Sequence, residues 1–89
     1  MTKHFNIQVY GLVQGVFFRA TAKEQADKLG ITGFAENRID GSVYIEAEGE
    51  ENQLNDFIKW CNGGPSMAQV EKVIVNEDKL KNSIRFEVY

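Results

Sequence analysis

Cysteine and histidine are almost absent from this sequence, which has one of each among 89 residues. The lone cysteine, Cys61, cannot form a disulfide within the chain, and this is typical of proteins from a reducing compartment. We therefore expect a cytoplasmic protein. Cys61 and the only histidine, His4, are too few to supply the ligands that zinc and copper prefer, so we expect no metal and no cofactor.

Long apolar runs and an excess of basic residues are also missing. No run approaches the roughly 20 apolar residues that cross a membrane, and the N-terminal residues 1–5 lack the apolar core of a secretion signal. Ten lysines and arginines stand against 13 aspartates and glutamates, which gives a net charge of -3. Nucleic-acid binders usually carry a basic face, so we expect neither a nucleic-acid nor a membrane partner. Any bound anion must be small and held by a few local donors.

The hydrophobic pattern alternates between the strand period and the helix period over one domain, residues 1–89. Phe5, Ile7 and Val9 alternate with polar residues, and Asp40-Gly41 is typical of a hairpin turn. The expected strands cover residues 5–10, 33–37, 42–48, 70–75 and 84–88. The first expected helix ends at Gly30, and the second covers residues 51–62. This order predicts an α+β fold of the ferredoxin-like plait type, βαββαβ plus a short C-terminal strand. Its antiparallel sheet would carry both helices on one face.

The start of the first helix has two alternatives. Thr21 and Glu24 have the spacing of a capping box, whereas the first turn could also begin at Phe18. In either case Arg19 lies at the positive end of the helix. In the second helix Cys61 completes an apolar stripe, so we interpret it as a buried small hydrophobe rather than a nucleophile.

The stretch from Gly11 to Arg19 joins the first strand to the first helix and contains the candidate site. Glycine permits positive φ angles, so successive backbone N–H groups there can converge on one point beside the helix N-terminus. Such an arrangement binds phosphate, and an arginine adds a planar, permanently charged donor. The spacing alone also allows a glycine-bearing turn followed by a surface arginine. The Gly-Lys-Ser/Thr ending of a nucleotide-binding loop is absent.

Two segments of the chain resemble the acylphosphatase family. The first signature of that family is matched at Gly11, Val13, Gln14, Gly15, Val16, Phe18 and Arg19. The second is matched at Gly33, Phe34, Ala35, Asn37, Gly41, Val43 and Gly49, and Gly64-Pro65 with Ala68 and Val70 resembles the family's link after the second helix. The similarity runs from about Phe5 to Tyr89 and implies a small, free-standing, monomeric enzyme.

The resemblance implies a reaction and a role for particular residues. The substrate would be an acyl phosphate, and the products a carboxylate and inorganic phosphate. Backbone amides of Gln14, Gly15, Val16, Phe17, Phe18 and Arg19 would hold the phosphoryl group, with Arg19 neutralising its charge. Asn37 would orient the attacking water, and a side-chain amide can do so without acting as a general base. The alternative is a non-catalytic ferredoxin-like module that binds a ligand or regulates a partner.

Residue 36 departs from the family pattern, which commonly has a basic or neutral polar residue there. In a strand, Glu36 and Asn37 point to opposite faces of the sheet, so we expect a modest effect of Glu36 on the rate. His4 falls on the polar side of the first strand, and we expect it to be solvated. Tyr44, Glu46 and Glu48 are expected to face outward from the 42–48 strand, and the acidic residues 48–51 to be a solvated start of the second helix.

Overall fold

The computed structural model describes residues 1–89 and contains five strands and two helices. The strands are β1 (Thr2–Leu12), β2 (Thr32–Asn37), β3 (Val43–Glu50), β4 (Gln69–Asp78) and β5 (Phe86–Val88), and the helices are α1 (Phe18–Leu29) and α2 (Glu51–Gly63). The predicted ferredoxin-like plait is confirmed. No helix in the chain is both long and apolar enough to cross a membrane.

One sheet holds all five strands in the order β4-β1-β3-β2-β5. The first four run antiparallel to their neighbours, but β5 lies parallel to β2, with Ala35 beside Val88. The expectation of a purely antiparallel sheet is therefore wrong at this edge. The long segment between β4 and β5 crosses the sheet, so β5 arrives at the opposite edge running in the direction of β2.

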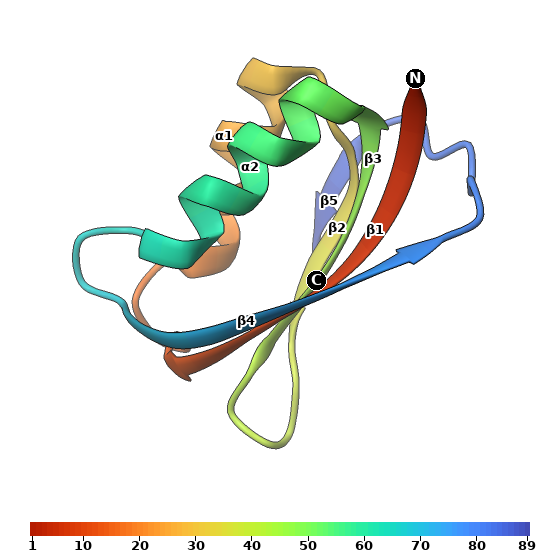
Figure 1. The fold of residues 1–89 in the computed structure, drawn as a ribbon. Coiled ribbons are helices and arrows are strands. Elements are labelled where there is room, and N and C mark those ends of the chain that lie inside the picture. The colour runs from red at the N-terminus through yellow and green to blue at the C-terminus, as the bar shows by residue number, and fades with distance from the viewer.

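Both helices cover the same face of the sheet (Figure 1). They bury the residues that helical spacing brings to one side of each: Phe18, Ala22 and Ala26 in α1, and Leu54, Phe57 and Cys61 in α2. These residues pack on the alternate side chains of the central strands, including Ile7, Val9 and Ile45, in a single core. As predicted, Cys61 is fully buried. Burial raises the pKa of its thiol, so the thiolate that a nucleophile requires is disfavoured.

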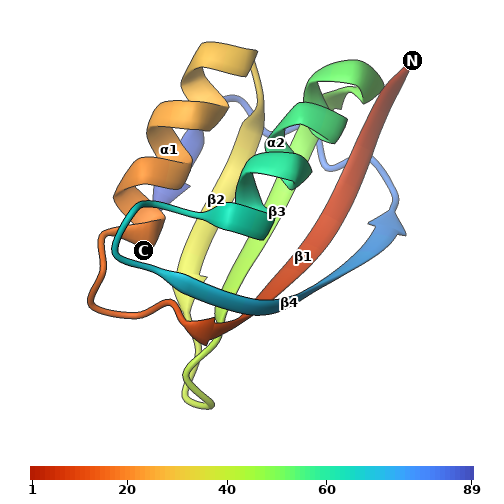
Figure 2. The same ribbon diagram turned by 60° about the vertical axis from the view of Figure 1, so that its left-hand side comes forward.

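Element boundaries depart from the sequence prediction mostly at the ends. The last strand is shorter than expected, because it begins at Phe86 and leaves Ile84 exposed. The first helix begins at Phe18, which confirms one of the two alternatives for its start. The other alternative, a capping box at Thr21 and Glu24, is wrong, since the Thr21 hydroxyl donates to the Phe17 carbonyl oxygen at 2.8 Å. The start of α1, the β2–β3 hairpin and the C-terminus after β5 lie toward the same end of the sheet (Figure 2). This arrangement positions the candidate site.

Candidate active site

The connection from β1 to α1 combines two backbone features that suit an anion. Gly15 and Phe17 both have positive φ, 77° and 66°, and such alternation turns N–H groups toward a common point. Phe17 is also the N-cap of α1, where no side chain makes a capping hydrogen bond and no acidic residue occupies the first turn. The first N–H groups of the helix therefore lack an intrahelical partner, and no carboxylate from the cap or the first turn competes for them. The positive φ of Gly15 was expected. The positive φ of Phe17 was not, because nothing in the sequence indicates a left-handed backbone at that residue.

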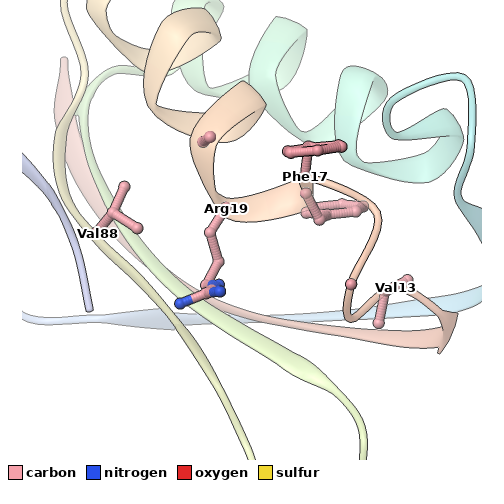
Figure 3. Close-up of a pocket in the computed structure, with 7 residues that line it drawn as sticks. Val13, Phe17, Arg19 and Val88 are labelled. Atoms are coloured by element: carbon pink, nitrogen blue, oxygen red, sulfur yellow. The ribbon is translucent and has the colours of Figure 1, made fainter.

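A pocket of about 270 Å³ opens at this connection. It is lined by Val13, Gly15, Phe17, Phe18, Arg19, Ala20 and Val88, and Arg19 is the only charged residue among them. Figure 3 shows Arg19 between Val88 of β5 on one side and Val13 and Phe17 on the other. A guanidinium in a mostly apolar pocket attracts an anion more strongly than one in open solvent, because the apolar walls exclude water.

The orientation of Arg19 depends on the end of the sheet. Its Nη1 donates to a main-chain oxygen of Tyr89, the last residue of the sequence, at 2.5 Å, and the Tyr89 N–H donates to the carbonyl oxygen of Ala35 at 2.9 Å. Tyr89 thus connects the guanidinium to β2 two residues before Asn37. A guanidinium has five N–H donors, so this contact leaves others for a ligand.

Asn37 ends β2 and is exposed to solvent. Its side-chain amide makes no hydrogen bond within the chain, so both its donor and its acceptor are free for water or a ligand. Asn37 is not among the residues that line the pocket. The structure therefore connects the loop and the strand end through their neighbours, and no hydrogen bond joins Arg19 to Asn37.

Gln14 makes the second connection, and the sequence did not predict it. The side-chain Nε2 donates to the carbonyl oxygens of Arg38 at 2.7 Å and Ser42 at 3.0 Å. Both carbonyls belong to the turn of the β2–β3 hairpin, directly after Asn37. The resemblance assigned Gln14 only a backbone amide, because the partners of its side chain lie more than 20 residues away and leave no local signal.

The hairpin turn is itself well ordered by hydrogen bonds. The Arg38 N–H donates to the carbonyl oxygen of Ser42 at 2.9 Å, and the Ser42 hydroxyl and N–H donate to Asp40 at 2.6 and 3.0 Å. These bonds from Ser42 hold the pKa of the Asp40 carboxyl below its ordinary value. Gln14 therefore binds to a turn whose shape is fixed by its own residues.

Glu36 lies on the side of the sheet away from the helices. It pairs with Tyr44 of β3 there, while its neighbour Ala35 is buried in the core. The Glu36 carboxylate forms an ion pair with Nε of Arg38 at 2.9 Å, and the Arg38 guanidinium carbon lies 4.0 Å from the centre of the Tyr44 ring. The negative charge that departs from the family pattern is thus compensated by a neighbour.

The solvated His4 expected from the sequence is wrong. His4 does lie on the outer face of the sheet, but it is only 1% exposed, with Nδ1 2.9 Å from Glu48 and Nε2 2.8 Å from Glu46. Glu48 is buried as well, because the segment after β4 covers it and donates the N–H groups of Lys81 and Asn82 to its carboxylate at 2.6 and 2.9 Å. Strand alternation predicted the correct face for His4, and contacts with distant residues decided its burial and that of Glu48.

Tyr44 and Glu46 continue this polar cluster along β3. The Tyr44 hydroxyl donates to Glu46 at 2.8 Å, and burial together with that contact raises the pKa of Tyr44 to about 12. Both side chains are partly buried rather than freely solvated. The chain contains no group of three or more histidine, cysteine, aspartate or glutamate side chains arranged to hold a metal ion.

Two helices on one face of a five-stranded mixed sheet define the class of small ferredoxin-like α+β domains. Within it, the acylphosphatase family model matches residues 5–88. An acylphosphatase from Rubrobacter xylanophilus is 42% identical over 98% of this chain and 80% of its own length. This chain belongs to the acylphosphatase family, which confirms the resemblance predicted from its two motifs.

Solved structures agree with this assignment. The crystal structure of the acylphosphatase from Bacillus subtilis superposes with a TM-score of 0.95 at 38% identity, over 100% of this chain and 99% of that one. That of an acylphosphatase from Coxiella burnetii gives 0.96 at 32% identity, over 99% and 93%. The chain is an enzyme of this family, and acyl phosphate hydrolysis is the reaction that the family and its structures support.

Proposed function

We propose that the 14–19 loop and Asn37 form the active site, where the carboxyl–phosphate bond of an acyl phosphate is cleaved to a carboxylate and inorganic phosphate. One observation supports this assignment above the others. The positive-φ backbone of Gly15 and Phe17, the uncapped start of α1 and the guanidinium of Arg19 all border one pocket. Each of these features stabilises negative charge on a bound phosphoryl group.

The phosphoryl group binds to the backbone amides of residues 14–19 and to Arg19. Phosphoryl transfer spreads charge over the equatorial oxygens in the transition state, so donors fixed before the reaction lower the barrier. The hydrogen bond from Arg19 to Tyr89 holds the guanidinium in one orientation. This pre-organisation reduces the conformational entropy that substrate binding would otherwise cost.

Asn37 orients the attacking water. Its amide does not titrate near neutral pH, so it positions the water without removing a proton. The water oxygen forms a bond to phosphorus as the bond between phosphorus and the acyl oxygen breaks. The electron pair leaves with the carboxylate, and the water proton passes to a phosphoryl oxygen. A carboxylate is a good leaving group, so the mechanism needs no general acid.

The enzyme acts as a cytoplasmic monomer. It needs no metal or cofactor, because the loop and Arg19 supply the positive charge that a metal would otherwise provide. Glu36 lowers the rate only modestly, since Arg38 neutralises its carboxylate on the outer face of the sheet. The alternative function, a non-catalytic ligand-binding module, would use the same loop. It would leave the free amide of Asn37 without a role.

Hydrolysis of an acyl phosphate and of a phosphate ester, compared side by side, tests the proposal. The purified chain should hydrolyse benzoyl phosphate, an acyl phosphate, rapidly and p-nitrophenyl phosphate very slowly, because a phenolate leaves less readily than a carboxylate. Phosphate release is measured for both compounds under the same conditions. Rapid release from p-nitrophenyl phosphate would identify a general phosphatase. Binding of benzoyl phosphate without turnover would identify the ligand-binding module.

A further inference from the structure

Phe17 has both a strained backbone conformation and an exposed aromatic side chain. Its φ of 66° lies in the left-handed region, where glycine and asparagine are far more common than an aromatic residue. Its side chain is nevertheless 72% exposed. An exposed, strained aromatic residue at the rim of a pocket contributes little to packing, so a role in ligand contact explains it better.

The pocket beside Phe17 has more room than a phosphoryl group fills. Even at about 30 Å³ per atom, the share of a water molecule in the liquid, the five heavy atoms of phosphate take about 150 Å³. The pocket has about 270 Å³. Part of the space therefore remains for the acyl group that is attached to the phosphoryl group.

The walls around this extra space are apolar. Val13 and Phe18 are buried and form the inner side, while Phe17 and Val88 are exposed at the rim on either side of Arg19 (Figure 3). Arg19 is the only charged residue, and the phosphoryl group and Tyr89 use its donors.

A second cation for a charged acyl group is missing from these walls. The nearest lysine in the sequence, Lys23 on the next turn of α1, binds Asp27 at 3.2 Å and the carbonyl oxygen of Phe86 at 3.0 Å. An acyl group that carried its own carboxylate or phosphate would therefore lose water without gaining a partner.

We propose that Phe17 forms an apolar subsite for the acyl group, so the enzyme selects acyl phosphates whose acyl part is aromatic or branched aliphatic. This inference depends on the proposed function, because it concerns the leaving group of that reaction. The ring of Phe17 contacts the acyl group while its backbone N–H remains part of the phosphate-binding loop. Phe17 is thus a specificity-determining residue, and its side chain contributes nothing to phosphate binding.

The test compares benzoyl phosphate with acetyl phosphate in the wild type, Phe17→Gly and Phe17→Leu. Glycine removes the ring and suits the positive φ of this position, whereas leucine keeps an apolar side chain. The ratio of kcat/KM for benzoyl over acetyl phosphate should fall about tenfold in Phe17→Gly. That change, about 1.4 kcal/mol, is what burial of about 60 Å² of apolar surface gives. The loss should be in KM, and Phe17→Leu should retain most of the preference.

Inhibition by inorganic phosphate distinguishes a contact with the acyl group from damage to the loop. The inhibition constant of phosphate should stay within about twofold in Phe17→Gly, since glycine keeps the backbone N–H. Ile74→Ala, which shortens an exposed apolar residue of β4 away from the pocket, is the control and should leave the ratio unchanged.

Three outcomes would overturn the inference. An equal loss for both substrates would mean that Phe17 shapes the loop and does not contact the acyl group. An unchanged ratio in Phe17→Gly would remove the subsite while the proposed reaction stood. Failure of the wild type to hydrolyse either acyl phosphate would refute the proposed reaction and the subsite together.

Discussion

The side-chain amide of Gln14 donates a hydrogen bond to the carbonyl oxygen of Arg38 at 2.7 Å, across 24 positions of the sequence. This contact joins the proposed phosphate-binding loop to the hairpin turn that follows Asn37. A reaction that needs a phosphoryl group and a water molecule in fixed relation requires such a connection, because misplacement of about 1 Å can cost on the order of 100-fold in rate.

Gln14→Met should therefore lower kcat more than it weakens phosphate binding. The substitution keeps the length of the side chain and removes the donor to Arg38 and Ser42. Two hydrogen bonds are lost, so the free energy of unfolding should also fall by about 1–3 kcal/mol. Steady-state kinetics and phosphate inhibition measure the first effect, and thermal unfolding measures the second. Gln53→Met on the exposed side of α2 is the matched control; an equally small effect of both variants on kcat would contradict the positioning role.

Asn37→Ala should abolish most turnover and leave phosphate affinity nearly intact. Loss of one well-aimed polar group costs on the order of 100- to 1000-fold in rate, and here that group is assigned to the water. The measurement is kcat for benzoyl phosphate together with the inhibition constant of inorganic phosphate. Retention of normal kcat, or loss of phosphate affinity in its place, would show that the role is misassigned.

Inorganic phosphate should inhibit competitively and raise the melting temperature through Arg19 and the loop. A ligand that binds only the folded state stabilises it by about 1.4 kcal/mol at ten times its Kd, which moves the midpoint of a domain this small by several degrees. Arg19→Ala is the control, because general salt effects act on it equally. Melting curves are compared at constant ionic strength. Equal shifts in both proteins would mean that phosphate binds elsewhere.

Activity should survive exhaustive chelation. The proposed site holds the phosphoryl group with Arg19 and backbone amides, so removal of divalent ions has no target there. The protein is dialysed against EDTA and assayed with benzoyl phosphate before and after magnesium or zinc is added. A large loss that either metal restores would contradict the mechanism.

Glu48 should make the stability of the fold depend on pH in the acid range. Burial alone would raise its pKa, but the N–H groups of Lys81 and Asn82 and the ring of His4 lower it below the ordinary 4.5. A lowered pKa in the folded state stabilises the fold above pH 4.5, and this contribution is lost as the pH falls through the folded-state value. Glu48→Gln should thus cost about 1–3 kcal/mol at pH 7, with the difference from wild type shrinking below pH 4.5.

Chemical denaturation at several pH values measures this difference. Glu24→Gln, at an exposed position of α1, is the control and should show little effect at any pH. A Glu48→Gln variant as stable as wild type at pH 7 would mean that the contacts with Lys81, Asn82 and His4 contribute nothing to stability.

The sequence by itself determined the order of elements, the core side of each strand and helix, and the family. Period-2 and period-3.6 patterns report on local backbone geometry, so Ile7 and Val9 in β1 and Cys61 in α2 were predicted to be buried and are. Gly15 was predicted to allow a positive φ for a similar local reason. The two motifs identified Arg19 and Asn37 as candidates through resemblance.

Tertiary structure alone decided what lies beside these residues. The burial of Glu48, which binds His4, depends on the segment after β4. The parallel edge of the sheet depends on the path of that segment to β5, and the orientation of Arg19 depends on Tyr89. The contact from Gln14 to Arg38 likewise joins residues far apart in the chain. A residue's own neighbours in sequence set its backbone periodicity, but its partners are set by chain segments that only folding brings together.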